Sequence, residues 1–138
     1  MAAIDAERAL ALVGHPFRPQ GRDERGLDCV GLCLAAFAMP AERFRSDYRL
    51  KGNQPSEIEA ALGSAFRKVA KAQRRPGDLL LMLVSEGQPH LAIMTANGFI
   101  HADARLRRVV ETPGEPDWPL IGVYRRRARR RRGNEWRR

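Results

Sequence analysis

Residues 26–39, "GLDCVGLCLAAFAM", decide the fold, because they place an aspartate and a cysteine directly before a long apolar run. From Cys29 onward the apolar residues are too dense for a one-sided stripe, which predicts a helix buried on most sides and closed by Pro40. A thiol in the first turn of such a helix lies near unpaired backbone N–H groups and the positive end of the helix dipole, which favour the thiolate. Asp28 could cap this helix through its side chain, and the Cys29 N–H could donate to an oxyanion.

This stretch by itself leaves two interpretations open. Cysteine is among the most commonly buried residues, so Cys29 could be a nucleophile or simple core packing. Cys33, in the middle of the apolar run, is predicted to be core. The two cysteines lie on one side of the helix, where geometry does not favour a disulfide. Their spacing and the lack of further ligands at regular intervals predict no zinc site, and we expect no metal and no cofactor.

Helices are predicted for the first half of the chain and strands for the second. A short helix is expected at residues 2–13, and another at 56–69, where Ser56 and Glu59 form a capping box before an apolar period that continues to Val69. Strand-like runs follow at 79–84, 90–95, 98–103, 107–112 and 119–124. Helices first and antiparallel strands afterwards predict an α+β domain with a sheet of about five strands.

The length of 138 residues suits one hydrophobic core, so a single domain is expected at residues 1–124. The first residues carry carboxylates where a secretory signal needs a basic start. No run reaches the roughly 18 to 20 apolar residues of a membrane helix. We therefore expect a protein made in the cytoplasm, with no visible signal peptide and no membrane insertion.

The formal charge of +9 is concentrated at the C-terminus. Residues 125–138, "RRRARRRRGNEWRR", hold nine arginines and one glutamate, a net +8, which leaves +1 for the rest of the chain. The run from Arg125 to Arg138 has too little apolar content to pack alone and is predicted to be a tail. Its charges could pair with nucleic-acid phosphates. Trp136 offers only one stacking platform and no recognition fold accompanies it, so a solvated tail or one docked on a partner is favoured over a nucleic-acid arm.

A thiolate nucleophile needs an imidazole that holds its proton and returns it to the leaving group. The chain has three histidines, His15, His90 and His101. His15 lies beside proline in the loop "GHPFRPQGRDERG" and is predicted to be a solvated or turn residue. His90 and His101 bracket the Asn97-Gly98 turn in the strand half and are the candidate bases.

Four motifs, taken in order and approximate spacing, resemble the NlpC-like family of cell-wall cysteine peptidases. They are Asp28-Cys29-Val30-Gly31-Leu32, Pro76-Gly77-Asp78-Leu79-Leu80, His90-Leu91-Ala92-Ile93 and Gly98-Phe99-Ile100-His101-Ala102. The resemblance implies a papain-like core in which Cys29 is the nucleophile, His90 the general base and acid, and His101 the residue that orients His90. It implies peptidoglycan stem peptides as substrates, often cut between D-glutamate and diaminopimelate.

Two features depart from that pattern or strain it. The family often has a tyrosine whose hydroxyl faces the site, where this chain has Phe17. If Asn97 and Gly98 form a two-residue turn, His101 lies opposite Met94 and about 13 Å along the sheet from His90, too far for a direct hydrogen bond. A wider loop or a bulge could close that gap, and in some registers Asp103 becomes the orienting group instead.

The resemblance is closest to compact peptidases carried on phage tails and gene transfer agents, and it implies delivery to the cell wall by such a particle. Tail hub or baseplate proteins are then the expected partners, in contact with the arginine tail. An alternative function is a structural tail-tip component that keeps the fold without activity, which the Phe17 departure would suit.

Overall fold

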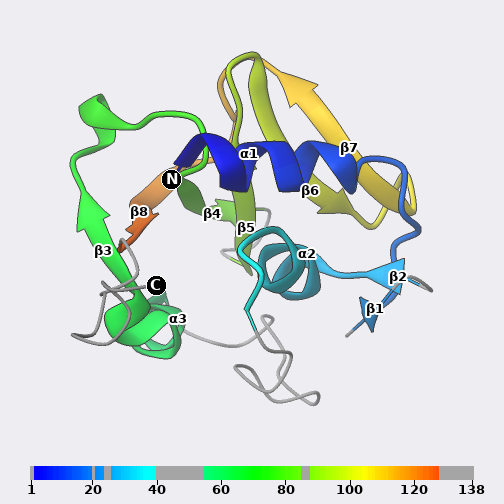
Figure 1. Ribbon diagram of the computed structural model, residues 1–138, viewed down its shortest axis with the longest axis horizontal. Coiled ribbons are helices and arrows are strands. Elements are labelled where there is room, and N and C mark those ends of the chain that lie inside the picture. Colours follow the sequence, from blue (N-terminus) through cyan, green and yellow to red (C-terminus); the bar gives the residue numbers. More distant parts are fainter. Residues whose placement is uncertain (1, 20, 24–25, 40–54, 85–87, 128–138) are drawn as a thin grey trace, which may run out of the picture.

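The computed structural model describes residues 2–19, 21–23, 26–39, 55–84 and 88–127, and an antiparallel sheet lies at its centre (Figure 1). Six strands form the sheet in the order β3-β8-β4-β5-β6-β7. They are β3 (Phe66–Val69), β4 (Leu79–Val84), β5 (Gln88–Met94), β6 (Gly98–Asp103), β7 (Arg108–Pro113) and β8 (Leu120–Arg126). The predicted α+β class and the five predicted strands are confirmed, and β3 makes a sixth.

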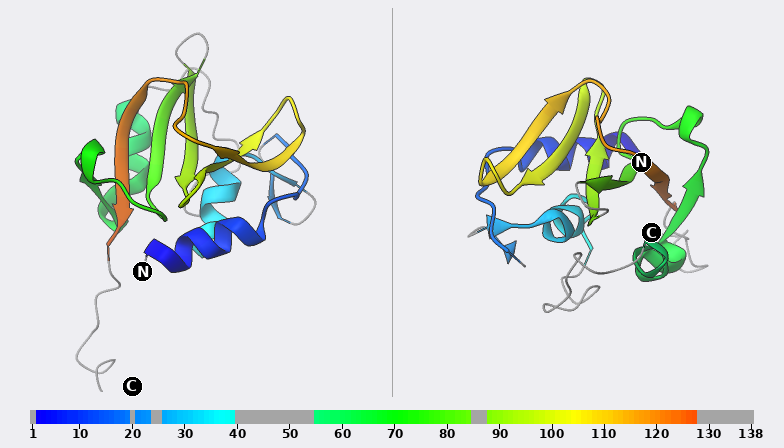
Figure 2. Two further views of the ribbon diagram at one scale, coloured as in Figure 1. Left: turned by 90° about the horizontal axis from the view of Figure 1, so that it is seen from above. Right: turned by 180° about the vertical axis from the view of Figure 1, so that it is seen from behind.

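The two N-terminal helices, α1 (Ala2–Ala11) and α2 (Cys29–Ala36), lie on the same side of the sheet (Figure 2). Between them and the sheet lies the main core, to which α1 contributes Ala9, α2 contributes Leu32, and the strands contribute Leu91, Ile93 and Ile100. None of the helices in the described residues is long and apolar enough to cross a membrane. The side chains of each strand alternate between this core and the opposite face, because successive residues point to opposite sides of a sheet.

The opposite face of the sheet carries a second, smaller apolar cluster. Its buried members are Leu80, Met82, Ala92, Phe99 and Val123. Four partly buried side chains pack against them, namely Val69, Met94, Trp118 and Leu120. No helix contributes to this cluster among the described residues, so the loop that carries Trp118 supplies part of its cover.

Helix α2 ends one turn earlier than the sequence predicts. The backbone N–H of Met39 donates to the Leu34 carbonyl and that of Ala38 to the Ala35 carbonyl, while Ala38 has a φ of +54°. This pair of bonds around a left-handed residue is a Schellman cap, which terminates a helix without proline. The cap therefore ends the helix at Ala36, and Pro40, the predicted terminator, lies outside the described residues.

The predicted helix at 56–69 is only partly right. Helix α3 runs from Pro55 to Leu62, so Ser56 lies inside the helix and not at the N-cap. Residues 63–65 form a 3₁₀ turn, and Phe66–Val69 form strand β3, which pairs with β8. The Glu59 carboxylate accepts from the Lys68 ammonium and the Tyr124 hydroxyl, which joins α3 to the sheet instead of closing a capping box.

Strand β8 extends two residues beyond the predicted end at Tyr124. Arg125 and Arg126 pair with Arg67 and Phe66 of β3. Arg125 also donates two hydrogen bonds, each 2.8 Å long, to the carboxylate of buried Asp78. The first two arginines of the basic run are thus part of the sheet, and residues 128–138 lie outside the described residues.

Arg126 ties three elements together. Its guanidinium donates to the Asp5 carboxylate of α1 at 2.5 Å and to the Phe37 carbonyl at the end of α2. The Asp5 side chain is 2% exposed, and burial raises its pKa while the charge of Arg126 opposes that rise. The contact fastens α1 to the last strand.

Replacing Asp5 with alanine should lower the free energy of unfolding by about 3 kcal/mol, because it leaves a largely buried arginine without its partner. Glu115→Ala is the matched control. It removes the ion pair between Glu115 and Arg74, in which the Glu115 side chain is 72% exposed. Exposed pairs of that kind contribute little, so the control should change stability by less than about 1 kcal/mol. Equal losses in urea unfolding of the two variants would contradict the structural role of Asp5.

Candidate active site

Asp28 caps α2 as the sequence predicts. It has extended backbone angles, φ −96° and ψ −172°, and its carboxylate accepts from the Gly31 N–H at 2.7 Å. This side-chain bond satisfies one of the unpaired N–H groups of the first turn. Cys29 is therefore the first residue of the helix, with its sulfur and its backbone N–H in the positive end of the helix dipole.

Gly31 allows the preceding loop to reach this turn. A methyl group at Gly31 would lie 2.0 Å from the Gly21 carbonyl oxygen, so a side chain there would clash with backbone. The same carbonyl accepts from the Asp28 N–H at 3.4 Å. The absence of a side chain at Gly31 thus lets the loop before α2 hold Asp28, and with it Cys29, at the helix start.

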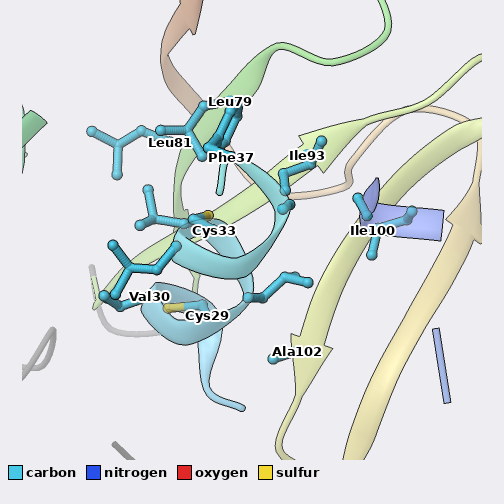
Figure 3. Packing of buried hydrophobic residues seen from close by; sticks show 14 of the residues in the cluster. Cys29, Val30, Cys33, Phe37, Leu79, Leu81, Ile93, Ile100 and Ala102 are labelled. Atoms are coloured by element: carbon cyan, nitrogen blue, oxygen red, sulfur yellow. The ribbon is translucent and has the colours of Figure 1, made fainter. Parts of the chain in front are cut away.

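The two cysteines lie one turn apart on α2, and both are buried in the main core (Figure 3). Both are thiols that form no disulfide. Cys33 lies one turn further along the helix, and burial, followed by the charges of Cys29 and Asp28, raises the pKa of its thiol well above the ordinary value. Cys33 is therefore a neutral core residue near neutral pH, as predicted, and Cys29 is the thiol at the helix terminus.

The hairpin between β5 and β6 has a wider loop than the sequence predicts. Met94 pairs with Phe99 and Ile93 with Ile100, so four residues, 95–98, separate the last paired residues of β5 and β6. The predicted two-residue turn, with His101 opposite Met94, is wrong. Continued along the strands, the observed register places His101 opposite Ala92, a diagonal neighbour of His90 within reach of long side chains.

His90 and His101 are directly hydrogen bonded. Nε2 of His90 and Nδ1 of His101 lie 2.9 Å apart, and the two rings are nearly perpendicular at 89°. On its other side, Nε2 of His101 lies 3.4 Å from the Thr112 hydroxyl of β7. His101 therefore stands between His90 and Thr112 in a chain of polar groups that crosses three strands.

Asp103 does not contact His90 through a hydrogen bond. Its Oδ1 accepts from the backbone N–H groups of Arg105 and Leu106 and shapes the turn between β6 and β7. Its charge still acts on both imidazoles, in the direction that raises their pKa. Of the two candidates for the group that orients His90, the structure brings His101 into contact.

Burial keeps both imidazoles neutral near pH 7. Burial is the largest cause, and the neighbouring His101 the second, of the fall in the pKa of His90 to about 4. Burial also lowers the pKa of His101. In a pair of neutral imidazoles one nitrogen of the 2.9 Å contact donates and the other accepts, so the tautomer of one ring fixes that of the other.

The low pKa of His90 makes stability depend on pH. An unfolded histidine has a pKa of about 6.5, so between pH 6.5 and 4 the unfolded chain binds the proton that the folded chain refuses. The contribution is therefore complete above about pH 6.5, and up to about 3 kcal/mol of stability is lost as the pH falls to 4. Urea unfolding across this range should show a steeper loss for the natural protein than for His90→Gln. Parallel pH curves would contradict the burial of a neutral His90.

Each histidine of the pair is next to a residue that packs with Cys29. Leu91, which follows His90, and Ala102, which follows His101, belong to the same core cluster as Cys29. The helix that begins at Cys29 contacts both β5 and β6. Helix α2 and the two strands therefore share one core. Because successive side chains of a strand alternate, the imidazoles of His90 and His101 lie on the other side of these strands from Leu91 and Ala102.

The remaining sequence candidates fall as follows. Phe17 is partly buried against the main core, and its backbone bridges Leu27, two residues before Cys29. His15 lies apart from the histidine pair, and its Nδ1 donates to the Leu12 carbonyl at the end of α1 at 3.0 Å. His15 is a turn residue, as predicted. In the part of the chain that the structure describes, no three histidine, cysteine or acidic side chains gather as metal ligands would.

Trp118 is the contact that sequence reasoning missed. Its indole ring centroid lies 5.7 Å from the ring centroids of both His90 and His101. It lies in the loop before β8, outside any periodic pattern of the sequence. The only local signal for it was a large aromatic residue next to the last predicted strand. The register of β8 that brings it there is a tertiary feature.

A sheet covered by a helix that begins at a cysteine, with hydrogen-bonded histidines on adjacent strands, defines a papain-like α+β protein. The sequence model described as the NlpC/P60 family matches residues 14–119, and the chain belongs to that family. No curated protein sequence matches the chain. The family and the papain-like fold implied by the four motifs are confirmed.

Solved structures share this fold at low sequence identity. The NlpC/p60 domain of the peptidoglycan hydrolase SagA is 24% identical with a TM-score of 0.59, over 82% of this chain and 89% of that one. NlpC1 from Trichomonas vaginalis is 17% identical with a TM-score of 0.66, over 91% of this chain but 43% of that longer one. RipD from Mycobacterium tuberculosis, described as a non-catalytic NlpC/p60 domain protein with a peptidoglycan-binding function, is 19% identical with a TM-score of 0.58, over 92% and 97%.

Proposed function

We propose that this chain is a cysteine endopeptidase that hydrolyses peptidoglycan stem peptides, with Cys29 as nucleophile, His90 as general base and acid, and His101 as the residue that orients His90. The observation that carries the proposal is the 2.9 Å contact between His90 and His101 in a member of the NlpC/P60 family. A base held by a second polar group is the arrangement that an activated thiol requires. The start of α2 supplies the thiol.

The proposed reaction uses the helix terminus and the histidine pair in turn. The Cys29 thiol loses its proton to His90, and the sulfur attacks the scissile amide carbonyl. The resulting oxyanion accepts a hydrogen bond from the Cys29 N–H at the helix start. The C–N bond then breaks as His90 returns the proton to the departing amine, which leaves a thioester on Cys29. Water attacks that thioester with His90 as base, and the free acid and thiol are regenerated.

This sequence of steps selects one tautomer of the pair. To accept the thiol proton at Nδ1, resting His90 must carry its own proton on Nε2 and donate to Nδ1 of His101. His101 then carries its proton on Nε2, directed at the Thr112 hydroxyl. The proposed role of His101 is therefore to hold His90 in the tautomer that can act as base.

The substrate bond we propose is the amide between D-glutamate and diaminopimelate. Purified peptidoglycan incubated with the protein should release fragments whose masses correspond to cleavage at that bond, and the Cys29→Ala variant should release none. Fragments cut at another amide would keep the peptidase function and reject the bond. Equal fragment patterns with the protein and with Cys29→Ala would reject the peptidase function.

A structural component without activity is the second candidate. Phe17 favours it, because the family often carries a tyrosine hydroxyl at this position and this chain has none. RipD shows that a non-catalytic protein can have this fold. Complete absence of turnover, together with binding of the protein to peptidoglycan sacculi, would favour this function over the peptidase.

We also propose that a phage tail or gene transfer agent carries this domain to the wall, with the arginine tail bound to an acidic surface of a tail hub or baseplate protein. Guanidinium groups suit carboxylates in a docking site. Nucleic acid is the less favoured partner of the tail.

Removing residues 128–138 should leave the hydrolysis of soluble muropeptides intact and weaken incorporation into the particle, increasingly so at higher salt. The truncation is placed after Arg127 because Arg125 and Arg126 belong to β8 and the Arg127 N–H donates to the Ala65 carbonyl. Shortening the chain after Tyr124 is the contrasting variant, and it should lose stability. Normal assembly of the protein that ends at Arg127 would reject the docking proposal.

A further inference from the structure

Trp118 covers the hydrogen bond between the two histidines. Its ring meets that of His90 at 79° and that of His101 at 72°, with both centroid distances at 5.7 Å. Phe99 lies against His101, at 5.2 Å, and against Trp118, at 6.4 Å. The polar contact is thus part-buried and flanked by Trp118 and Phe99, on the face of the sheet that no helix among the described residues covers.

A bulge in β8 puts Trp118 on this face. Leu81 of β4 pairs with Gly122, but the next residue, Met82, pairs with Leu120, so Ile121 is an extra residue in β8. An extra residue reverses the alternation of all side chains that precede it. Without it, Leu120, the first residue of β8, would point toward the main core. With it, Leu120 and the adjoining Trp118 pack on the small cluster that borders the histidine pair.

The loop that carries Trp118 is fastened at both ends. The Pro119 carbonyl accepts from the Leu83 N–H of β4 at 3.0 Å. Upstream, the Gly114 N–H donates to the Asn97 carbonyl at 2.9 Å. The indole position is therefore set by backbone as well as by packing, as a fixed cover requires.

We propose that Trp118 is a positioning residue, which keeps water from the His90–His101 hydrogen bond and holds both imidazoles in one orientation. A hydrogen bond in a dry, low-dielectric environment is stronger than one that competes with water. In the proposed reaction Trp118 affects the rate of the chemical steps and not substrate binding. This kinetic role rests on the proposed function.

The test compares Trp118→Ala with Leu120→Ala, a matched loss of apolar surface from the same cluster, two residues away on the same face. Imidazole NMR resonances of His90 and His101, followed from pH 4 to 8, report on the pair without any substrate, with His15 as the internal reference. Admitting water should raise the pKa of His90 from about 4 toward its ordinary 6.5 in Trp118→Ala and leave it unchanged in Leu120→Ala. The charge of Asp103, which acts on both imidazoles, is the same in all of these variants.

Kinetics supply the second readout. Trp118→Ala should lower kcat on muropeptides by roughly tenfold to a hundredfold with KM nearly unchanged, since a loosened base costs rate and not affinity. Trp118→Phe should restore most of the rate and of the low pKa. Should the alanine variant fail to fold, Trp118→Leu replaces it, with the same expectations.

An unchanged pKa of His90 in a folded Trp118→Ala protein would overturn the inference, as would a rise in KM at constant kcat, which would make Trp118 a substrate contact. A protein without any hydrolytic activity would still show the shift in the pKa of His90. An experiment that rejects the peptidase function can therefore be distinguished from one that rejects the positioning role of Trp118.

Discussion

Replacing Cys29 with alanine should abolish the hydrolysis of muropeptides, with a loss on the order of 10⁴-fold or more, because no other group can form the acyl intermediate. The variant should remain folded, since alanine keeps the helix start and the Asp28 carboxylate keeps its bond from the Gly31 N–H. The loss would thus be one of chemistry. Product formation followed by chromatography and mass analysis measures it.

Cys33→Ala is the matched control for that experiment. It removes the same atom one turn further along α2, from a site in the same core that is buried to a similar degree. It should lower stability, because deleting buried atoms leaves a cavity, and it should keep turnover within a few-fold of the natural protein. Loss of turnover in Cys33→Ala with normal turnover in Cys29→Ala would reverse the assignment.

Replacing His90 with alanine should lower kcat by roughly 10² to 10⁴-fold, the range that a general base contributes. The thiol would lose both the acceptor of its proton and the acid that protonates the departing amine. His101→Ala should cost less, because it removes the group that orients the base and leaves the base itself. Near-normal turnover of His90→Ala would exclude it as the base.

Asp103→Ala serves as the comparison for His101→Ala. Asp103 acts on the imidazoles only through its charge, while its carboxylate shapes the turn after β6. We expect His101→Ala to be the more damaging of the two substitutions. The reverse order in kcat, measured at constant KM, would transfer the orienting role to Asp103.

Local signals in the sequence predicted the parts of the site that depend on neighbours in the chain. The aspartate before Cys29 marked the start of α2, and the cap at Asp28 follows from residues three apart. Alternating apolar residues marked five of the six strands. Cys29, His90 and His101 could each be named from these local signals together with the family resemblance.

The relation between the two histidines could not be read from the same signals. Asn97-Gly98 predicts a tight two-residue turn, but the Thr95 hydroxyl accepts from the Gly98 N–H at 3.0 Å and donates to Glu111 of β7 at 2.7 Å. These contacts hold a four-residue loop and shift the register, which brings His101 next to His90. Glu111, a residue of a third strand, thus takes part in fixing the register of β5 and β6. No local sequence pattern around Asn97-Gly98 indicates this contact.

Strand β3 and the position of Trp118 escaped prediction for the same kind of reason. The apolar spacing of Leu62, Phe66 and Val69 fits a helix, yet pairing with β8 makes the last four residues of the run a strand. The bulge at Ile121, which turns Trp118 toward the histidines, depends on pairing with β4. Both features follow from partners distant in the sequence.

The measurement that tests the central claim most directly is the rate at which iodoacetamide alkylates each cysteine as the pH is varied, read by mass analysis of peptides from the folded protein. Cys29 should be labelled first near pH 7, because it lies at the helix start, and His90→Ala should slow that labelling. Cys33 should stay unlabelled until the protein unfolds, because burial raises the pKa of its thiol. Preferential labelling of Cys33, or labelling of Cys29 at the rate of an ordinary thiol with no effect of His90→Ala, would contradict the assignment of Cys29 as an activated nucleophile.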